Sequence, residues 1–108
     1  MRLINVTNSY SGLVRQQLEN TDAELVKVYT SGNITVIYTA APLHNEIVIV
    51  NKKRPITESE ILEIRNYFTK KLSLDEYDPL DIKTSVTPML VEISIPKHAK
   101  EKNYQTFR

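Results

Sequence analysis

Residues 24–51 read ELVKVYTSGNITVIYTAAPLHNEIVIVN, and this stretch decides the fold. Glu24–Thr30 and Ile34–Ala40 are rich in β-branched and aromatic residues, which favour strands. Ser31-Gly32-Asn33 lies between them and is a turn sequence, so the two segments predict a β-hairpin. After a short loop, Glu46–Asn51 predicts a third strand. Three consecutive strands joined by short connections predict an antiparallel meander.

The third strand contains the longest aliphatic run of the chain, Ile47-Val48-Ile49-Val50. A strand with one wet face alternates apolar and polar residues, whereas this run is apolar at every position. The run therefore predicts a central strand covered on both faces, by helices on one side and by a partner on the other. It is far shorter than the about 20 apolar residues that a membrane-spanning helix needs.

The segment Thr57–Leu72 carries the clearest helical signal. Thr57 and Glu60 have the spacing of a capping box, in which each side chain bonds the backbone N–H of the other residue. Apolar residues recur every three or four positions and predict a buried stripe, which consists of Ile61, Ile64, Phe68 and Leu72. We expect this helix to cover the sheet.

The N-terminal residues predict a strand followed by a short helix. Leu3–Thr7 is mostly apolar, and the helical spacing of Tyr10, Leu13, Val14 and Leu18 continues to about Asn20. Asn8, Ser9 and Ser11 are typical N-cap residues. A helix N-terminus also attracts anions, but residues 7–12 lack a glycine-rich phosphate cradle, so ordinary capping is the favoured interpretation.

The C-terminal part returns to β structure. From Ile82 onward β character increases, and Val91, Ile93 and Ile95 alternate with polar residues, with Pro88 interrupting the early part of the strand. Pro96 ends it. We therefore expect one domain over residues 1–96 and a charged tail over residues 97–108.

These elements predict an α+β fold in the order β-α-β-β-β-α-β. The expected architecture is a two-layer sandwich, in which a mostly antiparallel sheet of four to five strands carries two helices on one face.

Composition excludes several classes of protein. The 108 residues contain no cysteine, which excludes disulfides and cysteine-ligated zinc, and the early polar residues do not fit a signal peptide. We therefore expect a cytoplasmic protein without membrane association. Fourteen basic and thirteen acidic residues give a net charge of +1, which is low for a nonspecific nucleic-acid binder.

No residue group predicts a catalytic, metal or cofactor site, and we expect no cofactor. His44 and His98 have no metal-ligating neighbour in the sequence, and we interpret them as solvated loop residues. The acidic loop within Ser73–Asp81 has no calcium-binding spacing, so its carboxylates (Asp75, Glu76, Asp78 and Asp81) are interpreted as ordinary loop chemistry.

Two residue groups remain as candidates for binding. Lys52, Lys53 and Arg54 form a cluster that could contact an anion or a nucleic acid, provided that further cations from Lys70, Lys71 and the tail converge on the same face. The tail cations are Lys97, Lys100, Lys102 and Arg108, interleaved with Tyr104 and Phe107. Tyr29 and Tyr38 lie in the predicted hairpin. They are candidates for an interface, with packing at the core edge as the equal alternative.

The stretch Arg2–Tyr10 and the strand Thr35–Thr39 resemble a family of small uncharacterised proteins of lactic-acid and related Gram-positive bacteria, classed as a domain of unknown function. The resemblance covers most of the chain and implies a cytoplasmic bacterial protein. It supplies no catalytic or binding residue.

Three functional hypotheses follow. The leading one is a non-enzymatic binding or protein-interaction domain that associates with itself or with a protein partner through its sheet face. The second is nucleic-acid or anionic-ligand binding through Lys52, Lys53 and Arg54. The third is a small enzyme without a recognisable motif.

Overall fold

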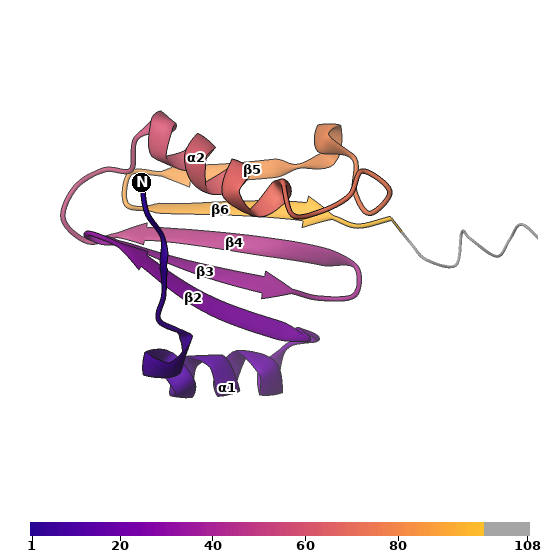
Figure 1. Ribbon diagram of the computed structural model, residues 1–108, viewed down its shortest axis with the longest axis horizontal. Coiled ribbons are helices and arrows are strands. Elements are labelled where there is room, and N and C mark those ends of the chain that lie inside the picture. Colours follow the sequence, from indigo (N-terminus) through magenta and orange to yellow (C-terminus); the bar gives the residue numbers. More distant parts are fainter. Residues whose placement is uncertain (99–108) are drawn as a thin grey trace, which may run out of the picture.

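The computed structural model describes residues 1–98, which form an antiparallel sheet of six strands with two α-helices (Figure 1). The strand order across the sheet is β1-β2-β3-β4-β6-β5. In chain order the elements are β1 (Ile4–Asn5), the 3₁₀ turn η1 (Thr7–Tyr10), α1 (Ser11–Asn20), β2 (Leu25–Ser31), β3 (Ile34–Ala40), β4 (His44–Asn51), α2 (Glu58–Thr69), the 3₁₀ turn η2 (Pro79–Asp81), β5 (Lys83–Thr87) and β6 (Leu90–Pro96).

The predicted meander is confirmed, and β2, β3 and β4 form it. Ser31 pairs with Ile34, which leaves Gly32 and Asn33 as a two-residue hairpin loop. Gly32 has φ +59°, and no other residue among those described has a positive φ. A positive φ at the first loop position alone fits a type II′ turn, where glycine carries no steric penalty.

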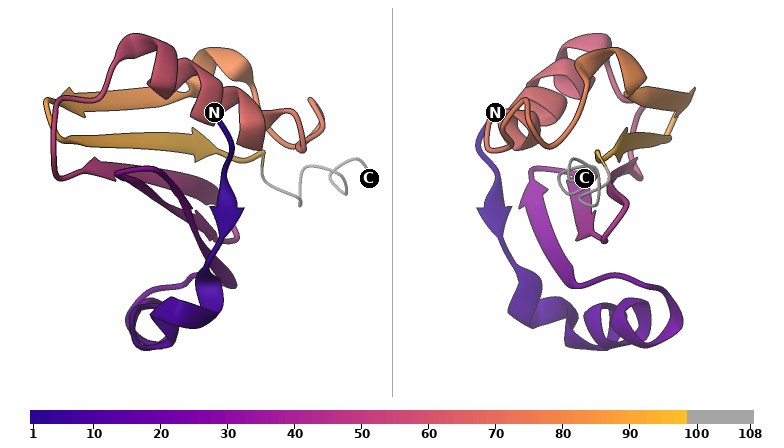
Figure 2. Two further views of the ribbon diagram at one scale, coloured as in Figure 1. Left: turned by 60° about the vertical axis from the view of Figure 1, so that its left-hand side comes forward. Right: turned by 90° about the vertical axis from the view of Figure 1, so that its right-hand side faces the viewer.

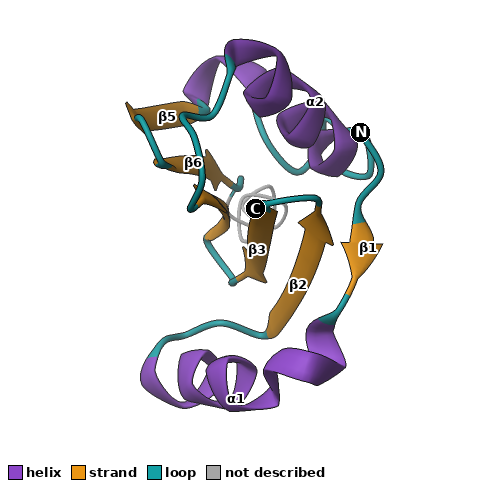
Figure 3. Cartoon of the chain, turned by 90° about the vertical axis from the view of Figure 1, so that its left-hand side faces the viewer, coloured by secondary structure: helices purple, strands orange, loops and turns teal. Residues whose placement is uncertain are grey.

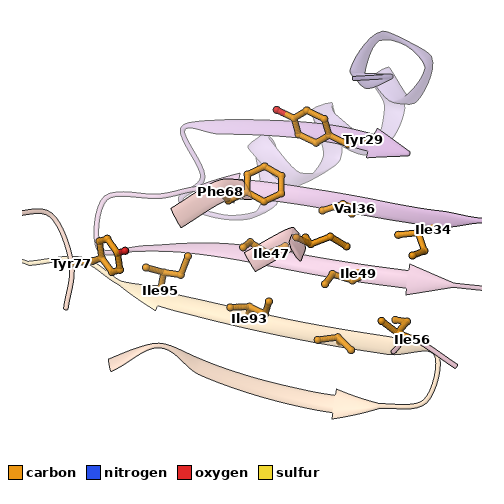
Figure 4. Packing of buried hydrophobic residues seen from close by; sticks show 12 residues of the cluster. Tyr29, Ile34, Val36, Ile47, Ile49, Ile56, Phe68, Tyr77, Ile93 and Ile95 are labelled. Atoms are coloured by element: carbon orange, nitrogen blue, oxygen red, sulfur yellow. The ribbon is translucent and has the colours of Figure 1, made fainter. Parts of the chain in front are cut away.

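Helix α2 covers one face of the sheet and builds the core there (Figure 4). Ile64 and Phe68 of α2 are buried against side chains from four strands, which include Tyr29, Val36, Ile47, Ile49, Val91, Ile93 and Ile95. The Phe68 ring stacks on Tyr38 with ring centroids 4.6 Å apart and an interplanar angle of 7°. Tyr29 and Tyr67 meet the Phe68 ring edge-on. Phe68 is thus the contact through which α2 holds β2 and β3.

The N-terminus of α2 forms the capping box that the sequence predicts. The Glu60 N–H donates to the Thr57 hydroxyl at 3.2 Å, and the Thr57 N–H donates to Glu60 Oε1 at 3.0 Å. Arg54 adds two hydrogen bonds to the Glu60 carboxylate, at 3.0 and 2.6 Å. These hydrogen bonds from Arg54, followed by those from Thr57, lower the pKa of Glu60 to about 2. The helix spans Glu58–Thr69, slightly less than the predicted Thr57–Leu72.

The prediction that both helices lie on one face is wrong (Figures 2 and 3). Because side chains alternate along β2, Tyr29 points toward α2. Val26 and Val28 point to the other face, where they are buried, with exposed fractions of 3% and 0%. There, η1 is tied to β2, because the Val28 N–H donates to Thr7 Oγ1 and the Val6 N–H donates to the Val28 carbonyl. Helix α1 follows η1 on that side. Because β2 has apolar residues on both faces, each face needs its own cover.

The start of the first helical segment also differs from expectation. Neither η1 nor α1 has a side-chain N-cap hydrogen bond. The Asn5 side chain instead accepts hydrogen bonds from the N–H and the hydroxyl of Thr7, at 2.9 and 2.6 Å. In place of the predicted caps at Asn8, Ser9 and Ser11, the segment begins with a turn that the Asn5 side chain holds.

The sheet has six strands because the C-terminal segment forms a hairpin. Thr87 pairs with Leu90, so Pro88 and Met89 form the turn between β5 and β6. Proline lacks the N–H that a ladder needs, which places Pro88 at a turn and not inside a strand. β6 lies between β4 and β5, and β5 is an exposed edge. Of the expected tail, residues 97–108, only Lys97 and His98 lie within the described residues.

We expect Phe68→Ala to destabilise the fold by about 3–5 kcal/mol, because it removes the buried ring and leaves a cavity under α2. Urea unfolding followed by circular dichroism measures the change in the free energy of unfolding. Leu62→Ala is the matched control, since Leu62 lies on α2 and is 55% exposed. An equal loss in both variants would contradict this account of the core.

We expect the stability of the wild-type chain to fall in acid by more than that of Glu60→Gln. The pKa of Glu60 is about 2 in the folded chain, below its ordinary value of 4.5, so the ionised carboxylate stabilises the fold. That contribution is complete above the ordinary pKa and is lost as the pH falls through the folded value. Urea unfolding at several pH values should show the difference between the two proteins shrinking over this range. Parallel curves would refute it.

Candidate protein-interaction surface

The face of the sheet opposite α2 carries a regular grid of side chains on β3, β4 and β6. We call it the open sheet face. Strand register places Thr35, Val50 and Leu90 in one row, Ile37, Val48 and Glu92 in the next, and Thr39, Glu46 and Ser94 in the third. Ile37, Val48 and Val50 are half-buried, and Leu90 is 40% exposed. The four apolar side chains are therefore adjacent, with threonines and two glutamates around them.

Helix α1 shares this side of the molecule but packs mainly against β2. None of its residues is buried, and Leu13, Val14 and Gln17 are half-buried. Figure 3 shows α1 near β2, with β6 and β5 at the far end of the curved sheet. The sequence predicts that the Ile47–Val50 strand is covered on both faces. Within residues 1–98, it is covered only on the face toward α2. Ile47 and Ile49 are fully buried there.

The basic cluster Lys52–Arg54 lies in the turn after β4. The Asn51 side chain holds this turn by accepting the N–H groups of Lys53 and Arg54, at 2.9 and 3.3 Å. The Arg54 guanidinium is engaged by Glu60, and the same hydrogen bonds raise its pKa. Lys52 and Lys53 are exposed. Anion binding here stays a prediction, with two lysines available in place of three cations.

The other cations do not converge on that turn. Lys70 and Lys71 follow the C-terminus of α2, whereas Arg54 bonds to Glu60 near the N-terminus of the same helix. The Lys71 ammonium lies 4.2 Å from the centroid of the Tyr67 ring. Lys97 follows β6 where Pro96 pairs with His44, at the end of β4 opposite Lys52, and its ammonium donates to the Ala41 carbonyl. Lys100, Lys102, Tyr104, Phe107 and Arg108 lie outside the described residues.

Tyr29 and Tyr38, the candidate interface residues, both face α2. Tyr29 is 7% exposed, and burial raises the pKa of its hydroxyl. The Tyr38 hydroxyl accepts a hydrogen bond from the buried Asn45 side chain at 2.9 Å, and burial raises its pKa as well. Of the two alternatives for these tyrosines, an interface or packing at the core edge, the structure has both rings packed against Phe68 in the core. The exposed surface of the sheet is therefore formed by other residues.

The acidic loop is organised by its own turn contacts. Glu76 Oε1 accepts the Ser73 N–H at 2.8 Å, and Asp78 Oδ1 accepts the Leu80 N–H at 2.9 Å. His98 lies beside this loop through a backbone hydrogen bond to Glu76, while His44 begins β4. Within the described part of the chain, His, Asp and Glu residues form no group of three that could hold a metal ion.

The sequence predicts association through the sheet face from the Ile47–Val50 run, but it does not show that Ile37 and Leu90 complete the patch, although part of the signal is present. Thr35 and Ile37 alternate with the buried Ile34 and Val36, as expected for a half-exposed strand. In β4 the uniform run Ile47–Val50 hides the alternation, because valine and isoleucine occupy both faces. The patch is formed by residues that become neighbours only when β4 pairs with β3 and β6.

Comparison with known proteins gives one family and one solved structure. No curated protein matches the chain. The crystal structure of a conserved protein of unknown function from Streptococcus thermophilus LMG 18311 is similar, with a TM-score of 0.87 and 42% sequence identity, over 92% of this chain and 99% of that chain. No helix within residues 1–98 has the length and apolar character needed to cross a bilayer.

The family whose model matches is described as Domain of unknown function (DUF1827), and the match covers residues 1–96. The resemblance expected from the sequence is thus confirmed. Neither the family nor the similar structure is described with an activity. The chain belongs to the DUF1827 family.

Proposed function

We propose that this protein is a non-enzymatic protein-interaction domain that associates with itself through the open sheet face. The observation that carries the proposal is the contiguous apolar patch of Ile37, Val48, Val50 and Leu90 on the sheet face opposite α2, a side on which α1 packs mainly against β2. A cytoplasmic location in bacteria, expected from the sequence, is part of the same proposal.

The physical reason is the cost of leaving these side chains in water. Burying apolar surface yields roughly 25 cal/mol per Å², and contiguous apolar patches on soluble proteins mark interaction sites. The patch also has the composition of an interface, with an apolar centre and polar residues such as Thr35, Thr39 and Glu92 around it.

The two alternatives have less support. Nucleic-acid binding requires convergent cations, and the clusters at Lys52–Arg54 and at Lys70–Lys71 lie toward different ends of α2. Catalysis requires a hollow lined by an acid, a base or a nucleophile, and in the acidic loop the Glu76 and Asp78 side chains are engaged in turn hydrogen bonds.

We expect the full chain to be a dimer at high micromolar concentration, measured by size-exclusion chromatography with light scattering. Val48→Glu places a charge at the centre of the patch and should weaken the dimer by about tenfold or more, because a buried unpaired carboxylate is costly. Leu62→Glu is the matched control, since Leu62 is an exposed leucine on the outer side of α2.

A strictly monomeric wild-type chain would overturn the proposal of self-association. A dimer that resists Val48→Glu as well as it resists Leu62→Glu would overturn the assignment of the open sheet face. Circular dichroism of each variant establishes that the comparison is made between folded proteins.

A further inference from the structure

We infer that helix α1 of a second copy of the chain covers the open sheet face, so that two copies form a reciprocal two-fold dimer. The inference rests on the proposed self-association and specifies its partner surface. Each α1 then lies between β2 of its own chain and strands β3, β4 and β6 of the partner.

The first argument is the match in size. Strands in a sheet are about 4.8 Å apart, so three of them present a strip roughly 10–14 Å wide. A helix with its side chains is about 10 Å across, and ten residues of helix are about 15 Å long. The three rows of the open sheet face, about 6.8 Å apart along each strand, extend for a similar length. The strip therefore has room for one helix of the size of α1.

Second, helix α1 is only partly packed within its own chain. Isolated helices shorter than about 12 residues are marginal in water and depend on tertiary contacts. α1 has ten residues and none is buried, and Tyr10 and Leu18 are 39% and 40% exposed. One flank of α1, which includes Ser11, Val14 and Leu18, borders an open hollow of about 660 Å³ whose lining comes from η1 and α1 alone. This flank is available to a partner.

The third argument is charge. Arg15 and Glu19 lie on the flank of α1 that lines the hollow, on either side of Leu18, and the open sheet face carries Glu46 and Glu92 beside Ile37 and Val48. Within residues 1–98, neither Arg15 nor these glutamates form an ion pair. With Leu18 on the apolar patch, Arg15 is placed to meet Glu92 of the partner at the rim.

The fourth argument is symmetry. Helix α1 and the open sheet face lie on the same side of the molecule, opposite α2 (Figure 2). A two-fold axis between them makes each contact twice and closes the assembly at two copies. If the two surfaces lay on opposite sides, the same contact would propagate into a filament. The arrangement thus predicts a dimer and no larger species.

The test is a charge exchange in the full chain. Arg15→Glu and Glu92→Arg, made separately, should each raise the dissociation constant of the dimer about tenfold or more, because like charges then face each other at both junctions. An equimolar mixture of the two variants should recover dimers to within about threefold of wild type, since every junction again joins opposite charges. Native mass spectrometry with one variant tagged should show heterodimers above their statistical share.

Two controls separate this inference from the proposed function. Lys53→Glu reverses a charge at an exposed turn and should leave the dimer unchanged. Glu92→Arg leaves α1 intact, so its effect cannot come from a weakened helix. If Val48→Glu breaks the dimer while the two charge variants do not, or if mixing them restores nothing, α1 is not the occupant and the open sheet face remains the interface. If the wild type is monomeric, both proposals fall.

Discussion

The packing of Phe68 and Ile64 against the sheet is the interaction on which the rest of the structure depends. Every strand from β2 to β6 except the edge strand β5 contributes buried side chains to the layer under α2. Phe68 contacts the aromatic rings of β2 and β3 and thereby connects the N-terminal half of the sheet to α2. The capping box and Arg54 fix where α2 begins, so the helix reaches the sheet in one register.

Much of this layer could be predicted from the sequence because its signals are local. Gly32 marks the hairpin, and Thr57 with Glu60 marks the helix start, since each motif acts over a few residues. The side on which α1 lies could not be predicted in this way. It depends on β2 having buried residues on both faces, with Tyr29 on one and Val26 and Val28 on the other. The sequence likewise indicates one strand interrupted at Pro88, where the structure has a hairpin.

The candidate surface was harder to predict than the fold. Tyr29 and Tyr38 were reasonable candidates by residue type, but strand alternation sends both toward α2. The sequence indicates a basic cluster at Lys52–Arg54 for possible anion contact, and in the structure the Arg54 side chain bonds to Glu60 at the N-terminus of α2. The open sheet face depends on register across three strands, and β6 reaches β4 through a long connection whose length does not fix that register. The leading expectation from the sequence, association through the sheet, rests on the Ile47–Val50 run beside tyrosine-rich strands, with only two helices available as cover.

The position of β6 between β4 and β5 also has a consequence for how the chain folds. The contacts of β2, β3 and β4 are between neighbours in the sequence, whereas β6 pairs with β4 only after α2 and two further turns have been made. Closing a long loop costs more entropy than closing a hairpin, so local pairing is favoured early and the β4–β6 ladder late. Until β6 arrives, β4 is an unpaired edge during synthesis. Its Ile47–Val50 run then exposes an apolar edge that makes the nascent meander prone to aggregation.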